Sequence, residues 1–464
     1  MLVKPESLVD RDLEWGALRQ FLQRKTRLGI VYGPRRVGKS YLLDALCEAT
    51  GGHRYQAIAG SAAAQLADFG RELGELFGVG PLQLDSWPDA LARLTRLERP
   101  FVAIDELPYL TETTPELPSM LQRYVDAGQG PPLILSGSAL STMSQLIEAR
   151  EPLYGRAGTV LVPTPFFGRD LVELWEVDEP RAALWVDAAL GGLPGYRPLL
   201  PPPGKDLDAW MAGEVLAPGS PLLDAAEADL AGSADPPALR GVYRSILAAI
   251  AAGERSFSGI ARVSGLAAGA LSRPLAALER GSLVERVPDP LRGRRDRYEL
   301  ADPHLRFWLA AIVPNRSRLQ AGAAAEVWER LRETTWPSQV LGPRWEAVVR
   351  AHVERESESF GGPFRTVGVT TVADRAGRSS HEVDLVAVRE GRVATLGEAK
   401  LRALGVADLE RLLRIQDLLD VPEATLVLAS ATGFEPGLKP AIAERPNGGP
   451  VVTISPGDIY GGGG

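Results

Sequence analysis

One octapeptide near the amino terminus constrains this chain more than any other feature. It follows an apolar run over residues 28–32 and precedes a helix-like stretch over residues 40–50. Its two glycines allow the backbone to point NH groups at phosphate oxygens, and the start of the following helix adds positive potential. A lysine for the β- and γ-phosphates and a serine for Mg²⁺ complete the pattern, which predicts a site for ATP with Mg²⁺ as cofactor. The predicted nucleotide-binding residues are Gly33, Pro34, Arg35, Arg36, Val37, Gly38, Lys39 and Ser40.

The composition is that of a folded protein with several domains. The 464 residues are 45% hydrophobic and 24% charged, and they contain no run of eighteen apolar residues or recognisable leader. We therefore expect a cytoplasmic protein with no membrane partner. A net charge of −8 disfavours a general polyanion binder, so any contact with DNA must be regional. The one cysteine, Cys47, has the spacing of a core residue, and the four histidines do not cluster near it.

Short apolar runs alternate with helical stretches in the first part of the chain. Runs buried between helices are typical of a parallel α/β sheet, which is the fold class expected here. The expected strands are 28–32, 55–59, 101–105, 133–136 and 159–162.

The third of these runs ends in two carboxylates, Asp105 and Glu106. We expect Ser40 to ligate Mg²⁺, Asp105 to hold the ion through water, and Glu106 to polarise the attacking water. Ser138, or Ser136, follows the next strand and is a candidate γ-phosphate sensor, although serines there also cap helices. Arg156 is a candidate arginine finger acting within or across subunits, the alternative being an exposed salt bridge.

Several motifs together resemble the archaeal-type ATPase family, a branch of the P-loop ATPases close to the AAA+ and STAND groups. They are residues 9–14, the octapeptide, IDELPYL at 104–110, SGS at 136–138, YGR at 154–156 and GGLPGY at 191–196. The resemblance implies that Arg11 lies near the base and ribose, and that GGLPGY leads into a small helical lid. It also implies a nuclease-like domain at the carboxyl end.

Residues 240–300 have the outline of a winged helix. Three helical stretches precede two short strands, 282–287 and 298–300, joined by a basic loop. The third helix would be the recognition helix and carry Arg273. The alternatives are a packing or lid element and a solvated loop. The predicted DNA contacts in the loop are Arg292, Arg294, Arg295 and Arg297.

A second chemical pattern lies further along the chain. Asp384 in one expected strand precedes Glu398-Ala399-Lys400 in the next, and Glu346 lies on an earlier helix. This matches the PD-(D/E)xK nuclease core. Asp384 and Glu398 would bind Mg²⁺, and Lys400, on the same strand face as Glu398, would activate water or stabilise negative charge. Glu-x-Lys pairs are also common on surface strands, and such folds are also retained for binding alone.

The sequence thus predicts an ATPase domain (1–190), a helical lid (191–235), a winged helix (236–315), a helical connector (316–340) and a nuclease-like domain (341–464). The expected function is a Mg²⁺-dependent ATPase that binds and cleaves DNA. Two alternatives are a STAND-type signalling switch that never touches DNA, and a transcription regulator whose ATPase gates the winged helix. An arginine finger acting across subunits would require a homo-oligomer.

Overall fold

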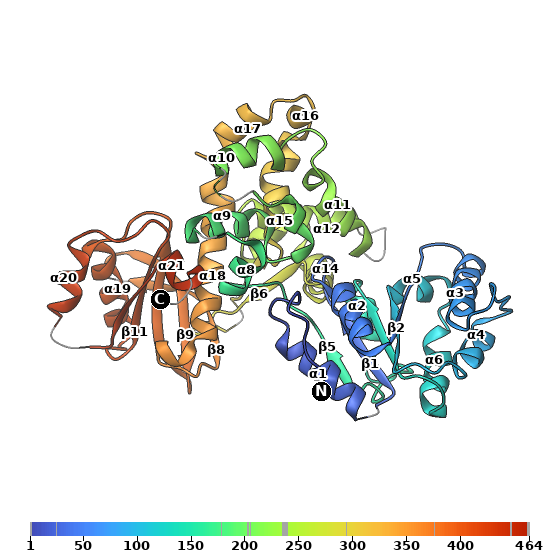
Figure 1. The fold of residues 1–464 in the computed structure, drawn as a ribbon. Coiled ribbons are helices and arrows are strands. Elements are labelled where there is room, and N and C mark those ends of the chain that lie inside the picture. The colour runs from blue at the N-terminus through green and yellow to red at the C-terminus, as the bar shows by residue number, and fades with distance from the viewer. Residues whose placement is uncertain are drawn as a thin grey trace. The chain divides into compact units, whose positions relative to one another are not determined.

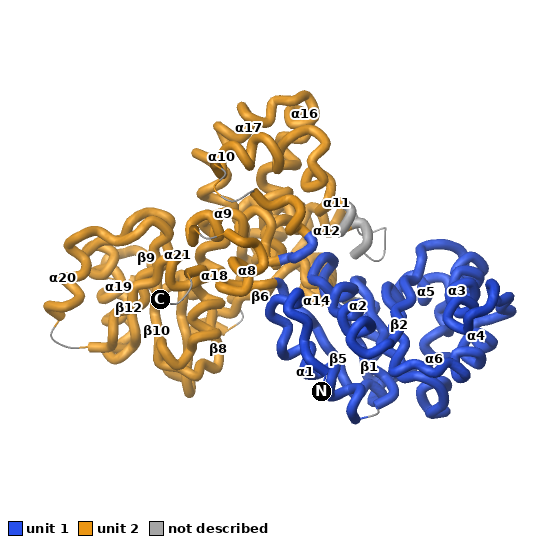
Figure 2. The backbone as a smooth tube through the Cα atoms, in the orientation of Figure 1, with its two compact units in different colours: residues 1–165, 193–195 blue, residues 166–192, 196–464 orange. Residues whose placement is uncertain are grey.

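A computed structural model describes residues 2–24, 26–177, 179–201, 204, 206–233, 240–293, 295–374, 376–445 and 448–461. The chain divides into two units, which Figure 2 colours separately. Unit 1 consists of residues 1–165 and 193–195, and unit 2 of residues 166–192 and 196–464. Each unit is described by itself.

A five-stranded parallel sheet forms the centre of unit 1 (Figure 1). Its strand order is β2-β3-β4-β1-β5. The central strands are buried on both faces, which explains why their sequences are continuously apolar rather than alternating. The strands are β1 (Leu28–Tyr32), β2 (His53–Gln56), β3 (Val102–Asp105), β4 (Leu133–Gly137) and β5 (Thr159–Leu161).

Helices cover both faces of this sheet. Helices α1 (Asp12–Gln23) and α2 (Lys39–Thr50) pack their apolar residues on the face that presents Val31, Ala103 and Ile134. The opposite face, which presents Ile30 and Ile104 among others, is covered by the remaining helices. These are α3 (Ala62–Leu76), α4 (Trp87–Leu94), α5 (Leu107–Thr113) and α6 (Leu117–Ala127), and the short helix α7 (Leu140–Gln145) follows β4.

The predicted parallel α/β sheet is confirmed, with one strand displaced. Strand β2 begins at His53, two residues before the predicted start, and ends at Gln56. Gln56 is paired with Asp105, the last residue of β3. The strand ends there because its hydrogen-bonding partner also ends, although the apolar run continues to Ala59.

Unit 1 ends before residue 190, where the sequence places the end of the ATPase domain. Helices α8 (Arg169–Trp175) and α9 (Pro180–Leu190) belong to unit 2. They join a helical part in which Trp185, Trp328 and Trp336 make edge-to-face or tilted ring contacts. The other helices of this part are α10 (Leu207–Trp210), η2 (Met211–Val215), α11 (Leu222–Ser233), α15 (Pro303–Phe307), η4 (Trp308–Ile312), α16 (Val313–Gln320), α17 (Ala324–Leu331) and η5 (Trp336–Leu341). Helix η1 (Pro194–Leu199) begins in unit 1 and continues into unit 2.

A buried carboxylate fixes α9 in unit 2. Asp187 is fully buried and accepts hydrogen bonds from Arg344 at 2.7 and 3.0 Å and from the Tyr460 hydroxyl at 2.6 Å. These partners belong to α18 (Gly342–Arg355) and α21 (Pro456–Tyr460). One side chain therefore joins three helices that are far apart in the sequence.

Replacing this carboxylate should destabilise unit 2. We expect Asp187→Ala to lower the free energy of unfolding by about 3–5 kcal/mol, because it leaves the Arg344 guanidinium without its counterion. Urea unfolding followed by circular dichroism measures the change. Asp417→Ala, at an exposed aspartate of the same unit, is the matched control and should change stability by less than about 0.5 kcal/mol. Equal stability of the two variants would contradict the assignment.

Residues 240–300 form three helices followed by an antiparallel hairpin, which we call the helix-hairpin segment. Ser256 accepts a hydrogen bond from Gly259 N at 3.1 Å and so caps the second helix, and Gly265, in the left-handed conformation, ends it. Val284 pairs with Leu300 across the hairpin. The elements are α12 (Arg240–Ala251), α13 (Phe257–Ser264), α14 (Ala268–Arg280), β6 (Val284–Val287) and β7 (Arg297–Leu300).

The carboxyl end of the chain forms a second five-stranded sheet, which we call the C-terminal sheet. Its order is β12-β11-β10-β9-β8, with β8, β9 and β10 antiparallel and the rest parallel. Glu390 and Gly391 both have positive φ in the β9–β10 turn, as a tight hairpin requires. The strands are β8 (Thr366–Asp374), β9 (Ser379–Arg389), β10 (Arg392–Lys400), β11 (Thr425–Ser430) and β12 (Val451–Ile454), and helices α19 (Val406–Leu418) and α20 (Leu438–Ala443) lie between them in sequence.

Candidate functional sites

The octapeptide forms a tight loop between β1 and α2. Gly38 has φ +95° and Arg36 has φ +65°, so the chain turns through left-handed conformations just before the helix begins. Lys39 is buried, and its Nζ donates to the carbonyls of Gly33 and Pro34, each at 2.9 Å. The lysine therefore lies across the loop where phosphate oxygens would be bound.

A hydrogen-bonded chain joins this lysine to the acidic end of β3. Lys39 Nζ donates to Ser138 Oγ at 2.9 Å, and Ser138 Oγ donates to Glu106 at 2.6 Å. Burial lowers the pKa of Lys39 to about 8, and the carboxylates of Glu106 and Asp105 oppose this effect. Ser138 thus lies between the lysine and the carboxylate, the location expected of a γ-phosphate sensor, while Ser136 is buried in the strand.

Ser40 and Asp105 meet at the carboxyl edge of the sheet. Ser40 Oγ donates to Asp105 Oδ2 at 2.6 Å, and the Asp105 side chain is fully buried. A hydroxyl and a carboxylate next to a phosphate-binding loop are the hard oxygen donors that Mg²⁺ prefers, so these residues fit the ion. Glu106 follows with φ +53°, an uncommon conformation for a residue with a side chain.

The sequence reading missed Arg54 in this site. Its guanidinium lies 3.2 Å from Asp105 Oδ2 and pairs with Asp44 at 2.6 and 3.1 Å. Tyr55, between Arg54 and Gln56, is buried in the core. Side chains alternate between the two faces of β2, which turns Arg54 and Gln56 away from the buried Tyr55. This alternation is the sequence pattern that could have identified Arg54. Arg54 holds positive charge beside the predicted magnesium ligand.

Two of the predicted arginines lie in different surroundings. Arg11 Nη2 donates to the carbonyl of Val37 at 3.0 Å, so Arg11 contacts the loop itself. Arg156 precedes β5, which is parallel to β1, and therefore lies at the amino edge of the sheet. It pairs there with Asp126 at 2.7 and 2.9 Å. Arg156 cannot serve as an arginine finger for its own chain from this edge, and a role across subunits stays a prediction.

A short segment from the GGLPGY motif completes the loop's surroundings. Gly195 N donates to the carbonyl of Arg36 at 3.1 Å. A Cβ on Gly195 would lie 2.6 Å from Arg36 Cβ, so this approach requires glycine. The motif was expected to lead into a lid, yet its residues 193–195 belong to unit 1 and lie against the phosphate-binding loop.

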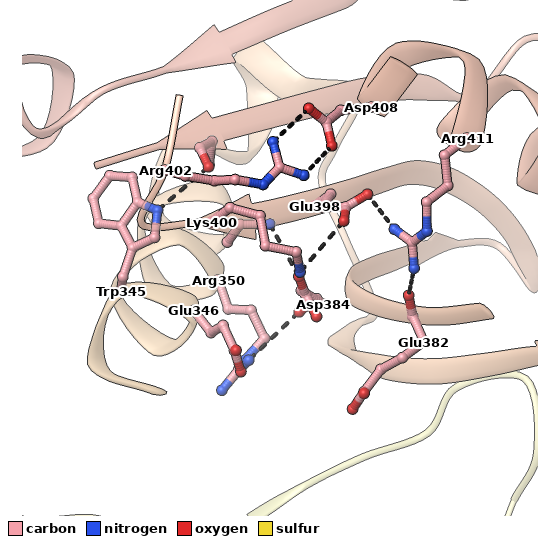
Figure 3. A network of polar contacts seen from close by, with 12 residues as sticks. Trp345, Glu346, Arg350, Glu382, Asp384, Glu398, Lys400, Arg402, Asp408 and Arg411 are labelled. Atoms are coloured by element: carbon pink, nitrogen blue, oxygen red, sulfur yellow. Dashed lines mark hydrogen bonds and ion pairs between the residues drawn. The ribbon is translucent and has the colours of Figure 1, made fainter. Parts of the chain in front are cut away.

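The second predicted site brings together side chains from two adjacent strands (Figure 3). Lys400 Nζ lies 2.8 Å from Asp384 Oδ2 and 3.3 Å from Glu398 Oε1. Ala399 N also donates to Asp384 Oδ2 at 3.1 Å. Glu346 reaches the same place from α18. We call Glu346, Asp384, Glu398 and Lys400 the carboxylate-lysine cluster.

Basic side chains neutralise every carboxylate of this cluster. Arg255 pairs with Glu346 at 2.7 Å, Arg411 pairs with Glu398, and Lys400 pairs with Asp384. Within the described part of the chain, no three acidic, histidine or cysteine side chains are arranged to hold a metal. Asp384 and Glu398 offer hard oxygens that suit Mg²⁺, but Lys400 and Arg411 would have to move aside. Arg255 and Arg411 were not predicted from the sequence, because their pairing with these carboxylates leaves no local sequence pattern.

The electrostatics of the cluster distinguish the two roles predicted for Lys400, which are activation of water and stabilisation of negative charge. Burial, then the charge of Asp384, raise the pKa of Glu346 despite Arg255. Burial disfavours the charged form of Lys400, but the carboxylates of Asp384, Glu398 and Glu346 outweigh it and raise the lysine's pKa. Lys400 is therefore protonated at neutral pH, which suits stabilisation of negative charge rather than removal of a proton from water.

The remaining predicted residues fall outside this cluster. Gln416 of α19 donates to the carbonyls of Pro422 and Ala424 and is structural. Arg273 is exposed on α14. Arg297 begins β7 and pairs with Glu382 of β9. Arg294 lies outside the described residues.

The fold and the loop define a class of protein. A parallel sheet with a phosphate-binding loop after β1 and an acidic end on β3 is a P-loop ATPase domain of the AAA type, and residues 25–168 match a family described as an AAA domain. Residues 308–412 match a second family, described as "Archaea bacterial proteins of unknown function". No helix in the described part of the chain has the length and apolar character needed to span a membrane.

Three similar proteins are from archaea. An uncharacterized protein of Methanocaldococcus jannaschii is 25% identical over 420 residues, which cover 88% of this chain and 90% of that protein. The Walker-type ATPase of Pyrococcus abyssi is 23% identical, covers 66% of this chain and 97% of its own, and has a TM-score of 0.49. The ORC2 protein of Aeropyrum pernix is 16% identical, with 72% and 97% covered and a TM-score of 0.43.

Proposed function

We propose that this protein is a Mg²⁺-dependent ATPase that binds DNA and cleaves it at the carboxylate-lysine cluster, with the nucleotide state controlling the cluster. The observation that carries the proposal is the meeting of Asp384, in the middle of β9, with Glu398 and Lys400 at the end of the adjacent strand β10. Two carboxylates with a protonated lysine are what phosphodiester hydrolysis needs, since they hold a divalent cation and balance developing charge.

The order of elements around the cluster supports a nuclease-like domain. Helix α18 is followed by β8, β9 and β10 and then by α19, which is the order expected from the sequence. The helix-hairpin segment likewise has the three helices and two strands of a winged helix. We propose these identities together with the predicted lid and connector, with the ATPase domain shortened to residues 1–165.

The ATPase site would work through its own residues as follows. Lys39 and the loop amides bind the phosphates, and Glu106 orients the attacking water. Ser138, which contacts both, would register whether the γ-phosphate is present. Mg²⁺, held by Ser40 and Asp105, would supply charge neutralisation.

A second candidate function is DNA binding without cleavage, within a signalling or regulatory ATPase. The neutralised state of the cluster favours it, because Arg255 and Arg411 already satisfy Glu346 and Glu398 without a metal. Buried ion pairs of this kind also hold purely structural centres together.

Incubation with supercoiled plasmid, linear duplex and single-stranded DNA, with Mg²⁺ and ATP, distinguishes the two. We expect Lys400→Ala to lower the cleavage rate by about 100-fold or more, as loss of one charge-stabilising group does in other enzymes. Lys439→Ala, at an exposed lysine, should leave the rate unchanged. Absence of cleavage by the wild type would overturn the nuclease proposal, and cleavage that survives Lys400→Ala would overturn the site.

A further inference from the structure

A polar cavity of about 910 Å³ lies beside the carboxylate-lysine cluster. One wall is the helix-hairpin segment, which contributes Arg255, Arg292, Arg295 and Arg297. The other wall includes Glu346, Asp384 and Lys400. Both walls belong to unit 2. The basic hairpin loop and the cluster therefore face the same space, whereas Arg273 on α14 does not line it.

Ion pairs and hydrogen bonds fasten the two walls together. Arg255 binds Glu346 at 2.7 Å, and Arg350 of α18 binds the buried Glu299 of β7 at 2.7 Å. Val369 N donates to the Pro288 carbonyl at 3.0 Å. A Cβ on Gly368 would lie 2.1 Å from the same carbonyl oxygen, so the backbones are in close contact. The cavity is a fixed feature of unit 2 rather than a gap between loosely joined parts.

Some of the charged side chains that line the cavity have an ion-pair partner, and others do not. Arg255, Arg297 and Lys400 each pair with a carboxylate of the cavity. Asp296 is paired with Arg286, and Asp289 accepts from Thr370 at 2.8 Å. Among the described residues, neither Arg292 nor Arg295 has an ion-pair partner. Two guanidinium groups without counterions at the rim of a cavity are suited to bind phosphate oxygens.

The size and depth of the cavity favour a single nucleic-acid strand over a duplex. Its volume is that of a pocket for a drug-sized ligand, so it admits a few nucleotides of one strand rather than the width of a duplex. The side chain of Asp384, which lines the cavity, is only 9% exposed, so a phosphodiester must enter the cavity to reach it. Basic grooves that follow one backbone are typical of single-strand binding.

We propose that this cavity binds a single DNA strand, with Arg292 and Arg295 holding its phosphates and directing the next phosphodiester toward Lys400. The proposal rests on the proposed DNA-processing function and specifies its substrate class. The helix-hairpin segment then acts as a strand-positioning wall of the cluster, and α14 is not the principal DNA contact.

Binding of labelled oligonucleotides to the full-length protein, measured by fluorescence anisotropy in EDTA over a range of salt concentrations, tests this. The probes are an oligothymidylate of about 12 nucleotides, a blunt duplex and an oligouridylate of the same length. We expect the oligothymidylate to bind at least tenfold more tightly than the duplex and no more weakly than the oligouridylate. Arg292→Ser combined with Arg295→Ser should weaken it at least tenfold and reduce the salt slope by about 1.4, or about 0.7 per lost contact. Arg365→Ser, at an exposed arginine that does not line the cavity, is the matched control and should leave binding unchanged, and Arg273→Ser tests α14 as the alternative contact.

The outcomes separate this inference from the proposed function. Single-strand binding that depends on Arg292 and Arg295 supports the inference even where no cleavage occurs. Cleavage combined with unchanged binding by the double variant overturns the inference and leaves the nuclease proposal standing. Equal or tighter binding of the duplex, loss of binding only in Arg273→Ser, or clear preference for the oligouridylate would each also overturn it.

Discussion

Lys39→Ala is expected to weaken ATP binding by up to about 100-fold and to remove ATP hydrolysis. The Nζ atom lies across the phosphate-binding loop, within hydrogen-bond distance of the Gly33 and Pro34 carbonyls. A hydrogen bond between a buried charged donor and a phosphate contributes up to about 3 kcal/mol, which corresponds to roughly a 100-fold change in affinity.

Isothermal titration calorimetry with ATP and Mg²⁺ measures the affinity, and phosphate release measures turnover. Lys439→Ala removes an exposed lysine and is the matched control. Circular dichroism establishes that Lys39→Ala folds, since the lysine also bonds Ser138. An affinity equal to that of the wild type would contradict the assignment of the loop.

Glu106→Gln is expected to retain ATP binding and to reduce hydrolysis by about 10²–10⁴-fold, the range for loss of a general base. The amide keeps the shape of the side chain and still accepts a hydrogen bond from Ser138 Oγ, which lies 2.6 Å from Glu106. It loses the negative charge that orients and polarises the attacking water.

Single-turnover hydrolysis and nucleotide affinity, measured side by side, separate the two effects. Glu112→Gln, at an exposed glutamate of α5, should behave as the wild type. A parallel loss of affinity and turnover in Glu106→Gln would assign Glu106 to binding instead. If Glu106→Gln hydrolysed ATP at the wild-type rate, another residue would have to act as the general base.

Local patterns made the ATPase site predictable from the sequence. The phosphate-binding loop, the acidic end of β3 and Ser138 each follow a buried strand, and parallel strands bring such ends to one edge. The residues that were missed are set by distant contacts. Arg54 meets Asp105 from 51 residues away, and Arg255 meets Glu346 from 91 residues away. The alternation of β2 places Arg54 and Gln56 on one face of that strand, but no periodicity identifies the distant partner of either arginine.

The end of unit 1 could not be predicted from the sequence for the same reason. Helix α9 follows the ATPase sequence directly, and its apolar pattern would serve either unit. Its place is decided by Asp187, whose partners Arg344 and Tyr460 lie 157 and 273 residues further along the chain. The carboxylate-lysine cluster was foreseen because Glu398 and Lys400 share one face of a strand. The arginine counterions of the cluster were not predicted, because they lie on other helices and loops of the chain.

The chain passes between units 1 and 2 at three peptide bonds, after Pro165, Gly192 and Gly195. The three residues between the last two crossings lie against the phosphate-binding loop, held by the hydrogen bond from Gly195 to Arg36. A segment this short, tied at both ends to unit 2, cannot be displaced without pulling on the residues that flank it. The backbone that contacts the phosphate-binding loop through Gly195 is therefore covalently continuous with unit 2 on both sides.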